Sequence, residues 1–175
     1  MDRELHPHQR CRIAIVGKYV QLQDAYLSIS EALKHAGICK DARINIEYID
    51  AEEVTEKNAD QLLGEMDGII IPGGFGSRGL SGKQAAITYA RTHRVPLLGI
   101  CLGMQMMAVE FARNGLGKAN ANTTEVDPST PDPIIDLMPD QVNNLHNICL
   151  LYTSRQICLY RRPFPVSCTL HRQPL

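Results

Sequence analysis

The stretch Val95-Pro-Leu-Leu-Gly99-Ile-Cys101-Leu-Gly103-Met-Gln105 predicts a buried strand, a sharp turn that carries one cysteine, and a helix that begins at once. The apolar run 95–100 has the length of a parallel strand covered on both faces. Gly99 and Gly103 flank Cys101 two residues away on either side. This is the spacing of a nucleophile elbow, with cysteine in place of serine. A side chain at either glycine is expected to collide with the neighbouring strand or helix.

The elbow gives a chemical reason for a cysteine at this turn. The helix that follows directs its first N–H groups and its positive dipole end at the sulfur, which favours the nucleophilic thiolate over the thiol. The same amides, that of Leu102 first, can hold a developing oxyanion. The spacing alone fits an alternative equally well, in which Cys101 packs as a small buried hydrophobe.

A second segment supports the nucleophile hypothesis. The apolar strand Gly68–Ile71 runs into Pro72-Gly73-Gly74-Phe75-Gly76-Ser77-Arg78-Gly79, which holds four glycines in seven residues. Such a loop at the carboxyl end of a buried strand presents backbone N–H groups to a ligand, here a phosphate, a carboxylate or an oxyanion. The glycine order does not fit the dinucleotide fingerprint, so we expect no NAD. The alternative is a merely flexible turn, which would not need Pro72 to stiffen its entry.

Strands and helices alternate along the first hundred residues. The pattern predicts strands, helices and turns in the order strand 12–19, helix 24–37 with Gly37 as its stop, edge strand 44–49, short polar helix within 51–64, strand 68–71 and helix 84–93. This order predicts an α/β fold with a doubly wound, mostly parallel sheet of the flavodoxin-like or Rossmann-like kind. The glycine loop and Cys101 then follow consecutive strands and share one edge of the sheet.

Composition limits the possible functions. A chain of 175 residues suffices for one α/β domain, and a net charge of −1 suggests neither nucleic acid nor a polyanion as partner. No apolar run reaches membrane-spanning length, and the first residues do not open a signal peptide. The six cysteines show no metal-ligand spacing, so we expect no metal site and a cytoplasmic protein. Residues 1–11 are polar and are predicted to be a linker or a disordered lead.

The two glycine-containing segments resemble those of class I (triad-type) glutamine amidotransferases. Further segments narrow the resemblance to the C-terminal amidotransferase domain of CTP synthases: Lys18-Tyr19, Asp24-Ala-Tyr26, Glu31-Ala-Leu-Lys-His35 and Ala121-Asn-Thr-Thr-Glu125. The resemblance covers roughly residues 12–140. It implies that a cysteine attacks the side-chain amide of L-glutamine, forms a glutamyl thioester and releases ammonia.

The resemblance also implies roles for individual residues. Cys101 matches the nucleophile, Gly74 matches the glycine at the oxyanion, and Glu125 matches the acid that holds the α-amino group of the substrate. The positions Leu102, Gly103, Met104 and Gln105 match the stretch that lines the glutamine pocket. The implied partner is a synthase domain, not contained in these residues, where ATP-activated UTP becomes CTP. ATP and magnesium belong to that domain, so no cofactor is expected in this chain.

Two features depart from the family pattern. The histidine and glutamate that serve the cysteine stand in a His-Pro-Glu motif, which this sequence does not contain; His146 and His171 are the only histidines after the elbow, and no acid follows either. Residues 141–175 contain no Gly, Ala, Asp, Glu, Lys or Met but four arginines. We therefore interpret 12–140 as a partial amidotransferase domain whose C-terminal part is missing, and 141–175 as an unrelated or artefactual tail, or alternatively as a basic appendage.

The missing pair leads to the expectation that the chain does not sustain turnover, because thiol activation and protonation of the leaving ammonia both depend on it. Two further hypotheses remain open. One is a non-enzymatic fragment that binds glutamine or docks onto a synthase domain. The other is a different cysteine hydrolase on the same fold, which would require a base that the sequence does not reveal.

Overall fold

The computed structural model describes residues 9–74, 76–136 and 159–160. The predicted lead as far as residue 8, the loop residue Phe75 and the predicted tail except for 159–160 lie outside this part, as do His146 and His171. The described elements are β1 (Gln9–Gly17), the 3₁₀ helix η1 (Gln23–Tyr26), α2 (Leu27–Lys40), β2 (Ala42–Asp50), α3 (Ala59–Leu63), β3 (Gly68–Ile71), α4 (Leu80–His93), β4 (Leu97–Gly99), α5 (Leu102–Asn114), β5 (Ala121–Thr123), β6 (Asp132–Ile135) and β7 (Leu159–Tyr160).

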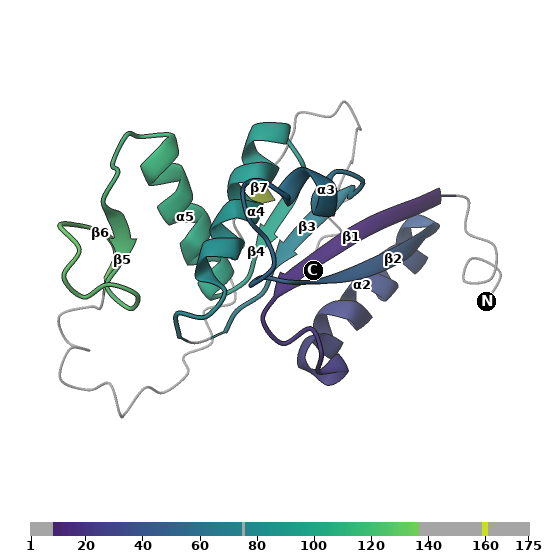
Figure 1. The fold of residues 1–175 in the computed structure, drawn as a ribbon. Coiled ribbons are helices and arrows are strands. Elements are labelled where there is room, and N and C mark those ends of the chain that lie inside the picture. Colours follow the sequence, from purple (N-terminus) through teal and green to yellow (C-terminus); the bar gives the residue numbers. More distant parts are fainter. Residues whose placement is uncertain (1–8, 75, 137–158, 161–175) are drawn as a thin grey trace, which may run out of the picture.

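The main sheet has the strand order β2-β1-β3-β4-β7 (Figure 1). The first four strands are parallel, and β7 pairs antiparallel with β4 over two residues. The order 2-1-3-4 is that of a flavodoxin-like sheet, so the predicted α/β class with a mostly parallel sheet is confirmed. The strand predicted for 44–49 is β2, and it lies at the edge of the sheet, as expected.

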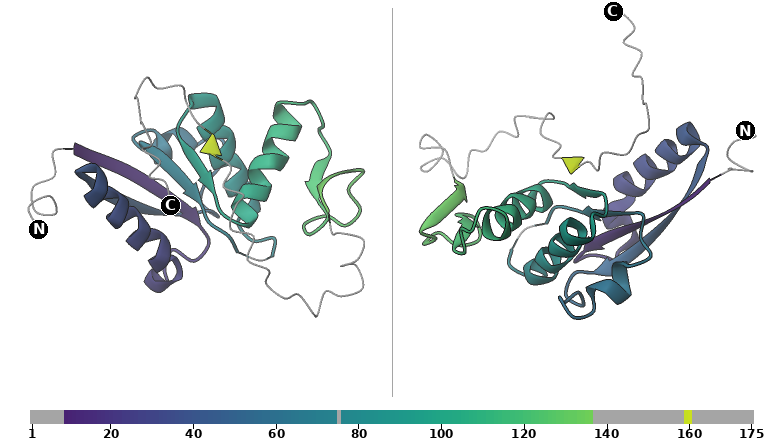
Figure 2. Two further views of the ribbon diagram at one scale, coloured as in Figure 1. Left: turned by 180° about the vertical axis from the view of Figure 1, so that it is seen from behind. Right: turned by 90° about the horizontal axis from the view of Figure 1, so that it is seen from above.

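Helices cover both faces of this sheet. Figure 2 shows α2 on one face, with α3 and α4 on the other. Alternate residues of β1 divide between the two sides, since Ile15 packs with Tyr26 before α2 while Ala14 and Val16 pack with the helices of the opposite face. Both layers are apolar, which explains why the strands read as nearly continuous apolar runs.

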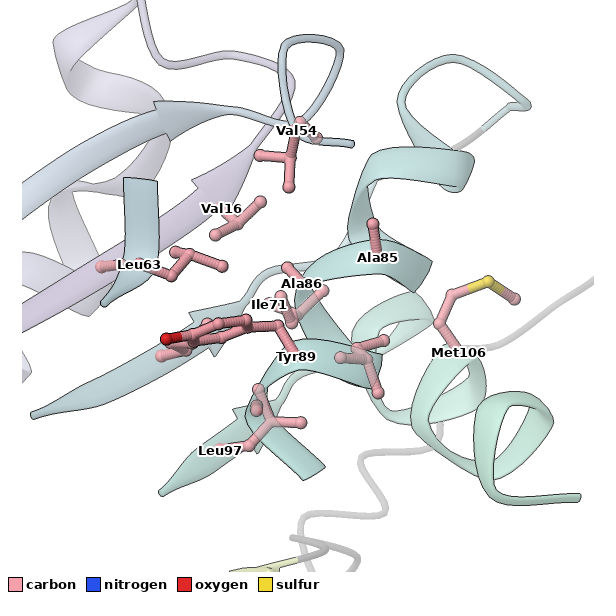
Figure 3. Close-up of a cluster of buried hydrophobic side chains, with 14 of the residues drawn as sticks. Val16, Val54, Leu63, Ile71, Ala85, Ala86, Tyr89, Leu97 and Met106 are labelled. Atoms are coloured by element: carbon pink, nitrogen blue, oxygen red, sulfur yellow. The ribbon is translucent and has the colours of Figure 1, made fainter. Parts of the chain in front are cut away.

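The larger core lies between the sheet and α3, α4 and α5. Figure 3 shows Val16 and Leu63 on one side and Ala86 and Tyr89 of α4 on the other, with Ile71 among them. Leu63 and Ile71 are fully buried. Because this core anchors the carboxyl ends of β1, β3 and β4, it fixes the positions of the loops that follow these strands.

Two boundaries differ from the sequence prediction in ways that strand pairing and packing explain. β1 begins at Gln9, inside the predicted lead 1–11, because it pairs with β2 from Ala42 onward. Gly37 does not end its helix; α2 continues to Lys40, and Asp41 takes the left-handed conformation at its end. A Cβ at Gly37 would lie 2.6 Å from the Ala42 carbonyl oxygen, so this glycine permits close packing of α2 against the start of β2.

A second, two-stranded parallel sheet of β5 and β6 lies beyond α5 (Figure 1). The Arg113 guanidinium on α5 donates a hydrogen bond of 2.7 Å to the Ala121 carbonyl and so ties this small sheet to the helix. It holds the loop that carries Glu125. Within the described part of the chain, no helix is long and apolar enough to cross a membrane.

Candidate active site

Cys101 stands at the turn between β4 and α5 with φ 53° and ψ −116°. This conformation is sparsely populated for a residue with a side chain and costs on the order of 1–3 kcal/mol. It turns the chain from strand to helix within one residue, so that Cys101 is the N-cap of α5 and its side chain is exposed. The predicted elbow is therefore present, and the alternative of a cysteine packed in the core does not agree with its exposure.

Both flanking glycines are needed for this turn. A Cβ at Gly99 would lie 2.6 Å from the Gly103 carbonyl carbon and from the Met104 nitrogen, both in the first turn of α5. A Cβ at Gly103 would lie 2.0 Å from the Ile71 carbonyl oxygen at the end of β3. The collisions expected from the sequence are thus found, one with the helix and one with the neighbouring strand.

The glycine loop lies directly against the cysteine. A Cβ built on Gly73 would lie 3.1 Å from the Cβ of Cys101 and 3.7 Å from its Sγ. Sequence reasoning singled out Gly74 and missed Gly73, which is the nearer of the two to Cys101. Gly74 has φ 141°, and a Cβ there would lie 3.0 Å from Cε of Lys18, a side chain only 6% exposed. The predicted shared edge of loop and elbow is confirmed.

Glu125 approaches the same edge from the second sheet. It lines a cleft of about 90 Å³ together with residues of the glycine loop, α4 and α5, namely Gly76, Ser77, Leu80, Leu102 and Val126. The backbone N–H of Glu125 donates to Oγ1 of the buried Thr123, which fixes the start of its loop. Glu125 and Leu102, 23 residues apart in the sequence, therefore meet across one cleft.

The remaining predicted pocket residues lie on the first turns of α5. Gly103 is buried and faces β3, so its role in the fold is close packing. Met104 and Gln105 are half-buried. The Gln105 side-chain oxygen is buried, and no donor meets it among the residues that the structure describes. A buried amide oxygen without a donor is costly, and its presence favours a ligand that supplies one.

Lys83 is a residue at this site that sequence reasoning missed. Its side chain is only 1% exposed, and its ammonium donates to the carbonyl oxygens of Pro72 at 2.9 Å and Gly73 at 3.5 Å. Burial and, to a smaller extent, the nearby charge of Lys18 lower the pKa of Lys83 to about 8, against the opposing effect of the charge of Cys101. The predicted helix began at Gln84, one residue too late to include this lysine.

No base for Cys101 is found in the described ranges 9–74 and 76–136. His93 ends α4; its Nδ1 donates to the Tyr89 carbonyl oxygen at 3.1 Å, and its ring stacks on that of Tyr89. That end of α4 precedes β4, whereas Cys101 follows β4, so the two residues lie at opposite ends of this strand. His35 is exposed on α2. Nor do those ranges contain a group of three His, Cys, Asp or Glu side chains that could hold a metal ion.

A larger groove of about 480 Å³ lies elsewhere, between α4, α5 and β5. Its lining includes Gln84, Thr88, Met106 and Arg113, and neither Cys101 nor Glu125 contributes to it. The chemically equipped position is therefore the edge of the sheet where the strained Cys101 lies against the glycine loop and where Leu102, the next residue, lines the smaller cleft together with Glu125.

The chain is similar to known proteins. Residues 21–158 match the family described as glutamine amidotransferase class-I. The CTP synthase of Lactiplantibacillus plantarum is 64% identical over 144 residues and that of Shouchella clausii 58% identical over 141 residues, each match covering 81% of this chain. The chain spans only 27% and 26% of the length of these relatives. A solved structure, the glutaminase domain of Trypanosoma brucei CTPS with bound acivicin, has a TM-score of 0.71 and 37% identity, over 77% of this chain and 53% of that one.

Proposed function

This chain belongs to the class I glutamine amidotransferase family, and from that premise we propose that it is the glutamine-hydrolysing part of a CTP synthase. The comparisons with known proteins confirm the family that the elbow and the glycine loop indicated. One observation supports the proposal most strongly: Cys101, the nucleophile by resemblance, occupies a strained turn directly against the glycine loop. Strain of this kind persists at active sites because the surrounding structure holds it in place.

In the proposed reaction, the Cys101 sulfur attacks the side-chain carbonyl carbon of L-glutamine. A C–S bond forms, the C–N bond breaks, and the amide nitrogen leaves as ammonia after it has received a proton. Water then hydrolyses the glutamyl thioester to glutamate and the free thiol. The attack places negative charge on the carbonyl oxygen, and preorganised N–H donors are the usual means of stabilising that charge.

We assign the oxyanion donors to the backbone amides of Leu102 and Gly74. The Leu102 amide is the first of α5, so it has no partner within its helix and gains from the helix dipole. Glu125 is assigned to the α-amino group of glutamine, which an ionised carboxylate pairs with naturally. The orphan oxygen of Gln105 supports a further role in the pocket, since a substrate N–H would satisfy it.

The ammonia is proposed to serve a synthase domain that uses ATP and magnesium to convert UTP into CTP, as part of pyrimidine nucleotide biosynthesis in the cytoplasm. The curated CTP synthases that match this chain are about four times longer than the matched region. No cofactor is proposed for these 175 residues.

We further propose that the 175-residue chain alone does not sustain turnover. General acid–base assistance is typically worth about 10² to 10⁴-fold in rate. The sequence holds no His-Pro-Glu motif to provide it. Glutamine binding depends on other residues and is expected to persist, whereas thioester formation is expected to be slow, because it needs both the activated thiol and the proton for the leaving ammonia.

The test combines an ammonia-release assay with thermal unfolding in the presence of L-glutamine, D-glutamine or L-asparagine. The proposal predicts that L-glutamine alone raises the melting temperature and that no continuous ammonia release follows. Continuous ammonia release by the chain that Cys101→Ala abolishes would contradict the proposed inactivity and show that another residue acts as the base. No response to L-glutamine would overturn the pocket assignment and favour a docking fragment or a different cysteine hydrolase.

A further inference from the structure

We propose that Lys83 is a positioning residue for the candidate oxyanion site: its buried ammonium holds the Pro72 and Gly73 carbonyls and thereby aims the loop amides at the substrate side. The inference rests on the proposed function for the identity of the oxyanion. It concerns a side chain that neither the elbow nor the resemblance singles out.

The geometry of the contact is unusual for a lysine. Lys83 lies in the first turns of α4 and is 1% exposed, so its ammonium is enclosed under the glycine loop. Two backbone carbonyls face it, those of Pro72 and Gly73. An ammonium that is removed from water requires such acceptors, since burying a charge without them is costly. The glycine loop is thus attached to α4 through a single side chain.

Holding these two carbonyls also orients two amides. In a planar trans peptide the C=O and the N–H point in opposite directions. The carbonyl of Pro72 shares its peptide plane with the Gly73 N–H, and the carbonyl of Gly73 shares its plane with the Gly74 N–H. Because both carbonyls point toward Lys83, both N–H groups point away from it. One of these, that of Gly74, is the loop donor that we assign to the oxyanion.

Lys83 also lies close to the candidate nucleophile. The groups that face it electrostatically are Lys18 at the end of β1 and Cys101 at the start of α5. The negative charge of Cys101 raises the pKa of Lys83 against the larger effect of burial. Gly73 lies beside both residues, since its carbonyl accepts from Lys83 and a Cβ built on it would lie 3.1 Å from the Cβ of Cys101.

The experiment compares Lys83→Met and Lys83→Gln with the wild-type chain and with Gln84→Met. Methionine keeps the length of the side chain but removes both the charge and the hydrogen bonds; glutamine keeps a donor without the charge. Gln84 is the next residue of α4 but lines the separate groove, so Gln84→Met is a matched control for a polar-to-methionine change in the same helix. All variants are first compared by circular dichroism and urea unfolding.

Two rates at Cys101 are measured by mass spectrometry over a range of pH. Iodoacetamide needs no pocket and reports the thiolate; a glutamine-mimicking electrophile reports the thiolate and the oriented amides together. Iodoacetamide labelling of Cys101 should stay within about twofold of wild type in both Lys83 variants, because this reagent does not use the oriented amides. For Lys83→Met the glutamine mimic should lose at least tenfold, and for Lys83→Gln less. Gln84→Met should stay within about twofold of wild type.

The outcomes separate this inference from the proposed function. Unchanged rates in Lys83→Met would overturn the role of Lys83, even if the glutamine mimic labels Cys101 selectively in the wild type. Equal slowing of both reagents in Lys83→Met would also overturn the positioning role, because iodoacetamide needs no oriented amides. Failure of the mimic to label the wild type, while iodoacetamide labels it, would reject the proposed function. Unfolding of both Lys83 variants beside a folded Gln84→Met would reduce Lys83 to a core residue and overturn the proposal.

Discussion

The elbow can be tested by adding one methyl group, in the variant Gly103→Ala. The added Cβ would lie 2.0 Å from the Ile71 carbonyl oxygen and 2.8 Å from its carbon, so α5 would have to move away from β3 by about 1 Å or more to restore ordinary contact. The Ile71 oxygen cannot withdraw freely, because it accepts the hydrogen bond of the Ile100 N–H at 2.9 Å. That bond holds the residue just before Cys101.

Two opposing effects determine how much Gly103→Ala changes the free energy of unfolding. Alanine in place of glycine within a helix stabilises by about 1 kcal/mol through backbone propensity. Overpacking against backbone costs about 1–3 kcal/mol or more, and loss of the Ile100 hydrogen bond adds about 1 kcal/mol. We therefore expect Gly103→Ala to lower the free energy of unfolding by about 2 kcal/mol and to abolish selective labelling of Cys101.

Urea unfolding followed by circular dichroism measures the predicted loss. Ala108→Gly, at an exposed position of the same helix, serves as the control for propensity and should lower the free energy of unfolding by about 1 kcal/mol. If Gly103→Ala instead matched or exceeded the wild-type stability, the close approach of α5 to β3 would be wrong, and the elbow geometry with it.

Three further changes have distinct expected outcomes. Glu110→Ala removes a carboxylate that is 1% exposed and accepts from the Arg91 guanidinium at 2.9 Å. The variant should lower the free energy of unfolding in urea by about 3 kcal/mol, and a loss below about 1 kcal/mol would contradict the burial of this pair. Gln105→Met removes a buried oxygen that has no donor in the described part of the chain, so the free energy of unfolding should not fall. Labelling of Cys101 by a glutamine mimic should slow about three- to tenfold relative to labelling by iodoacetamide. An unchanged ratio of these two rates would exclude Gln105 from the pocket. Between its lowered pKa of about 8 and its ordinary pKa of 10.5, Lys83 binds fewer protons in the folded than in the unfolded chain, so its contribution makes the free energy of unfolding rise with pH in that window. Lys83→Met should remove this rise. An identical pH dependence of the free energy of unfolding in both proteins would contradict the burial of the Lys83 charge.

The local chemistry of the site was predictable from the sequence because its signals are themselves local. Gly99 and Gly103 constrain the turn that lies between them, and the strand Gly68–Ile71 was predicted with the bounds that the structure gives. The parallel order followed from the alternation of strands and helices. The meeting of the glycine loop and Cys101 followed in turn, because parallel strands end at one edge.

Features that depend on neighbours in other elements escaped prediction. Gly37 and Gly82 both lie inside helices, where glycine usually signals an end, yet a Cβ at Gly82 would lie 1.6 Å from the Ala51 carbonyl oxygen. Gly82 thus permits close packing against a segment far away in the sequence, and Gly37 against the start of the next strand. Lysine is ordinarily a surface residue, and the burial of Lys83 follows only from its contacts with the carbonyls of the glycine loop. Glu125 was assigned by resemblance, since nothing local indicates that its loop returns to α5.

Labelling of Cys101 by a glutamine-mimicking electrophile tests the central claim most directly. Cys39 is also exposed but lies on α2, away from the glycine loop, so it provides an internal control within the same protein. The proposed site predicts that the electrophile modifies Cys101 in preference to Cys39, that excess L-glutamine slows this modification, and that Cys101→Ala eliminates it. Equal labelling of the two cysteines, or labelling that L-glutamine does not slow, would contradict the assignment of Cys101 as the nucleophile of a glutamine pocket.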